Sequence, residues 1–416
     1  MPLNRLLFIA HRVPYPPDKG ERVRAFHEIR ALAERYRVTL AAPTRSRQEA
    51  DAAGAMQEFC EAVITAPAGR IAGLARGAVR LLAGGCVTEG YFYSRHLVRR
   101  LAAEARREPF DLVMGYCSST LPYVLAIPAA ARLMDLVDVD SAKWSAYADR
   151  ARWPRRWLYT REAAGVGRLE RQSAERCDAV LLVSDAEADL LRRAVGAAFA
   201  LRVRGLSNGV DTDTFRPGAV EPADLGPAGV VFTGQMDYRP NVDGVCWFVE
   251  EIWPALHREH PAATLTIVGR DPAPAVRRLA ASPGVAVTGT VPDVRPYLAG
   301  AAAAVCPLRI ARGIQNKVLE AMAMALPVVA SPEALEGLDV SVGTDILRAG
   351  DPAQWRESLG SLLADGPRRR SIGDAARRRV ETDYTWPARL APLVSLCEQL
   401  ATREAREAPN PQAFTA

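Results

Sequence analysis

Residues 309–331 have the sequence RIARGIQNKVLEAMAMALPVVAS and follow an apolar run, 301–308, that predicts a buried strand. A polar loop around Gly313 then leads to a helix predicted from Asn316 to about Ala325. The helix stops at Leu326-Pro327, and residues 327–330 predict a second buried strand. A loop that leads into a helix N-terminus offers free backbone N–H groups and the positive end of the helix dipole. The stretch therefore predicts an anion site.

The predicted helix has two different sides. Val318, Leu319 and Met322 recur at helical spacing and predict the side that faces a core. Lys317 and Glu320 lie one turn apart on the other side, near the helix start. A cation and a carboxylate beside an anion site suit a ligand with both phosphate and hydroxyl groups, such as a nucleotide sugar.

Length and composition indicate a globular protein of two ordinary domains, since the chain has 416 residues, of which 49% are hydrophobic and 24% charged. No run reaches the roughly 18 apolar residues that a membrane span needs. The N-terminus lacks the apolar segment and the cleavage site of a signal peptide. We therefore expect a cytoplasmic enzyme, with the inner face of the membrane as a candidate place of association.

Two further classes of site are disfavoured by the residue types. The seven cysteines form no Cys-x-x-Cys pair, which argues against structural zinc and against a disulfide framework. The net charge of +5 comes almost entirely from arginine, and no arginine run alternates with aromatic residues as in a nucleic-acid module. We expect no nucleic-acid partner. Because Lys317 is one of only three lysines, we give it weight as a functional residue.

Strand-like and helical segments alternate along both halves of the sequence, from the strand at 6–10 to the strand at 328–330. This alternation is typical of parallel sheets covered by helices. Both halves have the same rhythm, so the expected fold class is α/β, with two Rossmann-like, doubly wound domains facing across a cleft. The segment 207–218 is rich in turn residues and marks the joint.

Several segments resemble the family-4 glycosyltransferases, which are retaining enzymes of the GT-B architecture. The sequence KVLEAMAMALPVVA at 317–330 is similar to the donor motif of that family. Asn208-Gly-Val-Asp211 resembles the interdomain segment of that family, and VFTG at 231–234 resembles the first strand of its second domain. Tyr384-Thr-Trp386 resembles the segment by which its chain crosses back before the last helix. Residues 234–243 and 313–317 resemble a narrower group, the sugar transferases associated with exosortase (PEP-CTERM) exopolysaccharide clusters.

The resemblance covers residues 200–390 well, and the first half only through Gly20 and the strand pattern. It implies an acceptor domain at 1–207 and a nucleotide-sugar donor domain at 208–385. A C-terminal helix at about 386–403 would cross back to the first domain. Residues 404–416 are polar and contain two prolines, which predicts a disordered tail.

The resemblance also implies roles for particular residues. The backbone at Gly313, Ile314 and Gln315 would cradle the donor diphosphate, Glu320 would accept hydrogen bonds from the ribose hydroxyls, and Gly20 would allow close approach to the donor. The implied donor-binding set is Gly20, Gly234, Arg239, Arg312, Gly313, Ile314, Gln315, Lys317 and Glu320, and the catalytic candidates are Asp138, Arg239 and Lys317.

The sequence departs from the family pattern at three positions. Arg312 stands where the family has a glutamate, eight residues before the second glutamate of its motif. Gln235 and Asn241 stand where it has arginine and lysine after the first strand of the donor domain. Arg239 and Lys317 are the cations that could substitute.

Asp138 follows a predicted strand of the first domain, where a carboxylate would face a ligand at the strand ends. It is a candidate for polarising the acceptor or orienting a donor hydroxyl. The alternative is a simple strand-end cap, which fits Asp140 equally well.

Trp144, Trp153 and Trp157 lie close together in the sequence, and five arginines lie between 150 and 161. Arginine with tryptophan suits the interface of a membrane that contains anionic lipid. The alternative is a basic helix whose arginines are solvated. Residues 69–85 are a second, weaker amphipathic candidate.

The resemblance implies a hexosyltransferase that moves a sugar, with retention, from a nucleoside-diphosphate sugar to a glycan or polyprenyl-linked acceptor in exopolysaccharide biosynthesis. We expect no cofactor and no metal, since the Asp-x-Asp spacings at 138–140 and 211–213 lie at a strand end and in the joint. Leaving-group charge would instead be stabilised by loop amides, the helix N-terminus and nearby cations. A nucleotide-sugar epimerase of the same fold and a non-catalytic nucleotide-sugar-binding protein remain alternatives.

Overall fold

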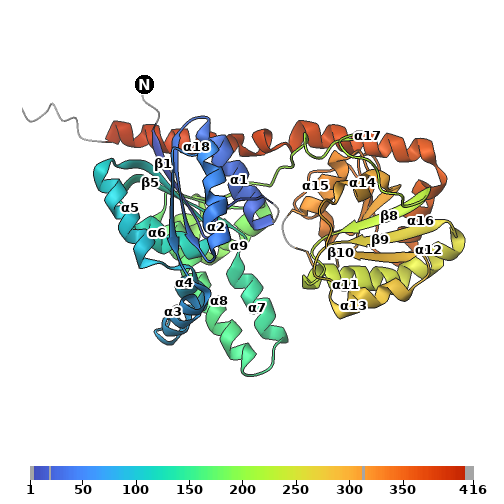
Figure 1. Cartoon of the computed structure of the whole chain (residues 1–416), viewed down its shortest axis with the longest axis horizontal. Coiled ribbons are helices and arrows are strands. Elements are labelled where there is room, and N and C mark those ends of the chain that lie inside the picture. Colours follow the sequence, from blue (N-terminus) through green and yellow to red (C-terminus); the bar gives the residue numbers. More distant parts are fainter. Residues whose placement is uncertain (1–3, 18–19, 312–313, 408–416) are drawn as a thin grey trace, which may run out of the picture. The chain divides into compact units, whose positions relative to one another are not determined.

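Two parallel sheets organise the part of the chain that the computed structural model describes, residues 4–17, 20–311 and 314–407 (Figure 1). The chain divides into two compact units, residues 1–207 with 390–416 and residues 208–389. Within each sheet the strand order begins 3-2-1-4-5-6 when the strands are counted along the chain, so both are doubly wound. The expected pair of Rossmann-like α/β domains is confirmed.

The described part of the first unit contains a seven-stranded sheet of order β3-β2-β1-β4-β5-β6-β7. The central strand β1 is buried along its whole length, as expected when helices cover both faces of a parallel sheet. The strands are β1 (Arg5–Ala10), β2 (Arg37–Thr44), β3 (Ala62–Pro67), β4 (Phe110–Tyr116), β5 (Ala129–Val137), β6 (Ala179–Leu182) and β7 (Val203–Gly205).

Helices lie between the successive strands along the chain, as the crossover connections of a parallel sheet require. They are α1 (Gly20–Ala33), α2 (Arg47–Ala52), α3 (Arg70–Leu82), α4 (Val87–Phe92), α5 (Arg95–Arg107), α6 (Leu121–Ala126), α7 (Asp140–Arg150), α8 (Arg155–Arg176), α9 (Asp185–Val195) and α10 (Ala197–Ala200), with 3₁₀ turns at Ala53–Glu58 and Ser118–Thr120.

The described part of the second unit contains a six-stranded sheet of order β10-β9-β8-β11-β12-β13. Its strands are β8 (Ala228–Thr233), β9 (Ala263–Val268), β10 (Val285–Gly289), β11 (Ala303–Cys306), β12 (Val328–Ala330) and β13 (Leu347–Arg348). Its helices are α11 (Arg239–Trp247), α12 (Trp253–Glu259), α13 (Pro274–Arg278), α14 (Arg295–Gly300), α15 (Asn316–Ala323), α16 (Pro352–Ala364) and α17 (Gly366–Asp383), with a π-helical turn at Phe248–Ile252 and 3₁₀ turns at Leu279–Ala281 and Glu333–Leu335.

The last helix, α18 (Trp386–Glu407), begins in the second unit and continues into the first. It extends to Glu407, beyond the predicted end near residue 403, and the rest of the predicted tail, 408–416, lies outside the described residues. Leu390, Leu393 and Leu396 bury one side of the helix.

Three local predictions differ from the structure. The strands β3 and β13 were not predicted. Both are edge strands, and β13 has only two residues. The helix predicted to about residue 325 ends at Ala323. Ala325 adopts a φ of 53°, which no helix continues, and Leu326 N–H donates to the Ala321 carbonyl to close the end.

Two segments that resembled family motifs lie against each other in the second unit. Val210 forms a parallel bridge with Thr385 and donates its N–H to the Tyr384 carbonyl at 2.8 Å. A Cβ on Gly209 would lie 2.7 Å from the backbone nitrogen of Trp386. Only glycine allows this approach, so the residue type at 209 has a structural cause.

Among the described residues, no helix combines the length and the apolar character needed to cross a membrane.

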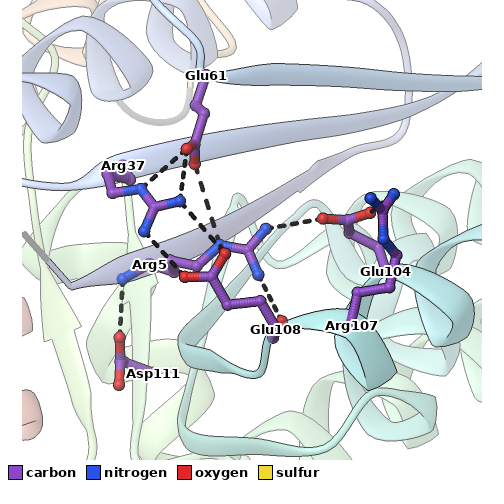
Figure 2. A network of polar contacts seen from close by, with 7 residues as sticks. All are labelled: Arg5, Arg37, Glu61, Glu104, Arg107, Glu108 and Asp111. Atoms are coloured by element: carbon purple, nitrogen blue, oxygen red, sulfur yellow. Dashed lines mark hydrogen bonds and ion pairs between the residues drawn. The ribbon is translucent and has the colours of Figure 1, made fainter.

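An ion-pair network ties the amino ends of β1 and β2 to the end of α5 (Figure 2). The buried Arg5 guanidinium lies 2.9 Å from Glu104 and 3.4 Å from Glu108 and also donates to the Glu108 carbonyl. Arg37 is more exposed and lies 2.6 Å from Glu61 and 2.9 Å from Glu108. The network therefore contains one buried and one solvated arginine with a shared partner.

Replacing the buried arginine should destabilise the protein far more than replacing the solvated one. We expect Arg5→Met to lower the free energy of unfolding by about 2–4 kcal/mol, because it leaves partly buried acceptors unpaired. Arg37→Met should have a much smaller effect, because water screens its ion pairs. Urea unfolding of both variants checks this, and equal losses would contradict it.

Candidate functional site

The loop before α15 and the loop after β8 start from neighbouring strands of the second sheet. β8 pairs with β11, and both strands end at the same edge because the sheet is parallel. The strand order reverses between β8 and β11, since β9 and β10 lie on one side and β12 and β13 on the other. In doubly wound sheets, ligands bind at the carboxyl ends of strands at such a reversal.

The side chain of Lys317, in the first turn of α15, reaches this reversal point. Its Nζ donates to the Oδ1 atom of Asn241 and lies 4.7 Å from the ring centroid of Phe232. It also lies 3.0 Å from the position that a Cβ on Gly234 would take. Glycine at 234 therefore leaves room for the ammonium group directly after β8.

Asn241, in the first turns of α11, holds this arrangement in place. Its side chain is buried, its Oδ1 accepts from Lys317, and its Nδ2 donates to the Gln235 carbonyl at 2.9 Å. One amide thus fixes both the lysine and the loop that follows Gly234. Asn241 was noted only as a departure from the family pattern, and its role became visible once α11 and α15 were placed together.

Glu320 lies one helical turn after Lys317 and shares its half-buried surroundings. Burial raises the pKa of Glu320 to about 7, although Lys317 opposes the shift. Burial likewise lowers the pKa of Lys317, while Cys306 and Glu320 oppose the change. For each group the effect of burial exceeds the opposing effect of the neighbouring charge. Both groups are therefore suited to a charged, hydrogen-bonding ligand.

The N-terminus of α15 is also connected to the segment that opens the second unit. The Asn208 amide donates to Oδ1 of Asn316, the first residue of α15, at 3.1 Å. Asn208 is buried. The predicted joint and the predicted donor helix therefore meet in one unit.

The remaining predicted donor residues have different surroundings. Ile314 is buried and Gln315 directly precedes α15, whereas Arg312 and Gly313 lie outside the described residues. Arg239 is exposed as the first residue of α11. Of the two candidate cations, Lys317 is the one that contacts Asn241 beside Gly234.

Two other candidates belong to the first unit. Gly20 is the first residue of α1. Asp138 follows Val137, a β-branched residue with a φ of 67°, at the carboxyl end of β5. Burial raises the pKa of Asp138 to about 7, with Asp140 and Glu187 adding to the shift. Asp138 can therefore be neutral or ionised near neutral pH, as a general acid or base requires.

Asp140 and the three tryptophans have different surroundings in the structure. Asp140 begins α7 and lies 3.6 Å from Lys143, an ordinary helix-start pair. Trp144 is partly buried against Tyr159, with ring centroids 5.5 Å apart. Trp153 and Trp157 are 83% and 49% exposed. Only the latter two of these tryptophans lie at the surface.

Within the described ranges, no three His, Cys, Asp or Glu side chains gather into a group that could hold a metal ion.

Comparisons with family models match both halves of the chain. Residues 20–214 match the model described as Glycosyltransferase Family 4, and residues 227–365 match the model described as Glycosyl transferases group 1. The boundary between the two matches lies beside the joint at Asn208.

One curated protein and several solved structures are similar to the chain. The alpha-maltose-1-phosphate synthase of Mycolicibacterium smegmatis is 32% identical over 250 residues, which are 52% of this chain and 62% of that protein. The sucrose-phosphate synthase of Thermosynechococcus elongatus has a TM-score of 0.71 at 19% identity, covering 96% of this chain and all of that one. Anabaena Alr3699/HepE in complex with UDP-glucose has a TM-score of 0.63 at 14% identity, covering 97% and 99%. These structures share the GT-B fold with this chain.

The raised pKa of Glu320 predicts a pH dependence of stability. The ordinary pKa is 4.5 and the folded value about 7, so the stability from this group is complete below pH 4.5 and is lost as the pH rises through 7. We expect up to about 3 kcal/mol of this loss between pH 5 and 8.

Glu320→Gln should abolish that part of the loss, whereas the exposed Glu333→Gln should keep it. Urea unfolding at pH 5, 6.5 and 8 measures the difference. An unchanged pH slope in Glu320→Gln would contradict the assigned burial.

Proposed function

We propose that this chain, a glycosyltransferase of the GT-B type by the matches of both its halves, transfers a sugar with retention from a nucleoside-diphosphate sugar. Residues 208–385 form the proposed donor domain. The observation that carries the proposal is the Lys317 ammonium group held beside Gly234, one turn from Glu320, at the strand-order reversal.

The chemistry of these groups fits a nucleotide sugar. Lys317 and the backbone N–H groups at the start of α15 would bind the diphosphate. The Glu320 carboxylate would accept hydrogen bonds from ribose hydroxyls, and binding would favour its ionised form. The neighbour that binds UDP-glucose makes UDP-glucose a suitable first probe.

In the proposed reaction, the bond between the sugar and the diphosphate breaks while the acceptor oxygen bonds to the same face of the sugar. Lys317 and the helix N-terminus would stabilise the negative charge that develops on the leaving diphosphate. The donor phosphate would take the acceptor proton, and Asp138 is proposed to polarise the acceptor. No metal ion or other cofactor is assigned a role.

The acceptor side of the proposal rests on sequence resemblance. We propose a hexosyl transfer to a glycan or polyprenyl-linked acceptor in exopolysaccharide biosynthesis, at the cytoplasmic face of the membrane. The narrower similarity to exosortase-associated transferases at 234–243 and 313–317 supports this choice. An epimerase would instead convert the donor without an acceptor, and a binding protein would show no turnover.

Donor binding should distinguish the two candidate cations. Lys317→Met and Glu320→Ala should each weaken UDP-glucose binding at least about tenfold, because each removes a hydrogen bond that involves a charged group. Arg239→Ala, the matched control, should change the dissociation constant by less than about threefold, since Arg239 is exposed. Isothermal titration calorimetry measures all three, and the reverse order would refute the assignment of Lys317.

Turnover should not require a divalent metal. With membrane lipid extract as the acceptor source, UDP release from UDP-glucose should continue at an unchanged rate in excess EDTA. Loss of activity that Mg²⁺ or Mn²⁺ restores would overturn the metal-free mechanism. Acceptor-independent conversion of the donor would favour the epimerase.

A further inference from the structure

Helix α3 in the first unit exposes four of its five large apolar side chains and buries both of its glycines. Among the described residues, ten large hydrophobic side chains are exposed, and four of them lie on this helix: Ile71 at 86%, Leu74 at 58%, Val79 at 66% and Leu82 at 80%. The buried residues of α3 are Gly73, Gly77 and Leu81. This is the reverse of the usual orientation of an amphipathic helix at a protein surface.

The orientation of α3 is set by close packing. A Cβ on Gly73 would lie 2.9 Å from the Tyr91 ring, and a Cβ on Gly77 would lie 2.8 Å from the Val87 side chain, so both glycines seat α3 closely against α4. The start of α4 is fixed in turn by Glu162 of α8, which accepts from Val87 N–H at 2.7 Å. The helix cannot turn its apolar side inward without breaking this contact.

The exposed side follows one stripe of the helix. Ile71, Leu74, Val79 and Leu82, with Ala75 and Ala78 between them, recur at helical spacing and are all exposed. A contiguous exposed apolar surface of this kind marks an interaction site.

The charged residues of α3 itself all have one sign. Residues 68–88 contain Arg70, Arg76 and Arg80 and no acidic residue. Arg80 pairs with Glu89 at 3.0 Å, and Arg76 donates to the Gly90 carbonyl. An apolar stripe whose own helix carries arginine and no acidic residue complements a bilayer that contains anionic lipid.

The helices that pack around α3 carry a further exposed apolar residue, the aromatic Trp153. α3 packs on α4, α4 packs on α8, and α8 packs along α7, and Figure 1 shows this group extending from the sheet of the first unit. Trp153, in the loop between α7 and α8, is 83% exposed, and arginines follow it at 155 and 156. Tryptophan is enriched where protein meets the headgroup region of a bilayer.

We propose that the outward face of α3, residues 71–82, is the surface by which this chain lies on a bilayer containing anionic lipid. The helix lies in the plane of the interface, with Ile71 and Leu82 in the acyl region and Arg70 at the headgroups. This proposal assigns the main contact to α3, the weaker of the two sequence candidates, and not to Trp144, which is packed in the fold. It does not depend on sugar transfer, because binding can be measured without a donor.

The test is co-sedimentation of the full chain with vesicles in the absence of nucleotide. One set contains equal parts of phosphatidylglycerol and phosphatidylcholine, and the other contains phosphatidylcholine alone. The variant is Ile71→Ser with Leu82→Ser, and the matched control is Leu201→Ser, since Leu201 is 90% exposed but lies outside α3. All three positions are exposed, so the variants should fold normally, which thermal unfolding checks.

The wild type and the Leu201 variant should bind the anionic vesicles and not the neutral ones. The double variant should lose at least about tenfold in partition coefficient, because two large apolar side chains no longer enter the acyl region. Failure of the wild type to bind anionic vesicles, or equal binding by the double variant, would overturn the proposal. A concentration-dependent dimer that the double variant abolishes, without vesicle binding, would assign the face to a second copy and would also overturn it.

Discussion

The proposed donor site is built around one ammonium group, that of Lys317, which is held partly out of water. Lys317 reaches the carboxyl end of β8 only because position 234 has no side chain and because Asn241 accepts its hydrogen bond. Burial lowers the pKa of this lysine and raises that of Glu320, which means that the fold disfavours the charged form of both side chains. Such a site costs stability and becomes favourable when an anionic, hydroxyl-bearing ligand binds.

The first unit concentrates buried charge in a comparable way around its own central strands. The Arg24 guanidinium lies 2.6 Å from Asp135 and 3.0 Å from Glu28, and it donates to the Leu206 carbonyl at 2.7 Å. Burial raises the pKa of Glu28 well above its ordinary value, with Asp135 adding to the shift and Arg24 opposing it. Here, however, the charges are paired within the protein, because Arg24 connects α1 to β5 and to the backbone at Leu206. This cluster therefore connects structural elements of the first unit, whereas the Lys317 ammonium group donates to the side chain of Asn241 beside the carboxyl end of β8.

The surface of the first unit has a feature of its own, the outward apolar side of α3. α3 is amphipathic in sequence, yet the glycines at 73 and 77 determine which side is buried, because only they fit against α4. The apolar side is thereby left outward, flanked by arginine. A transferase whose acceptor is attached to lipid would gain from this arrangement, since a bound bilayer raises the local concentration of acceptor. The proposed donor site and the α3 face lie on different units and can be tested separately.

The sequence by itself determined the alternation of strands and helices, the joint near Asn208 and the core side of α15, because hydrophobic periodicity and turn residues are local signals. Val318, Leu319 and Met322 are buried as their spacing predicts. Short edge strands such as β13 were missed because two residues carry no period. Which cation approaches Gly234, the role of Asn241 and the outward face of α3 depend on contacts between segments distant in sequence. Only the tertiary structure decided them, because close packing at glycine, and not residue type alone, selects which side chains meet.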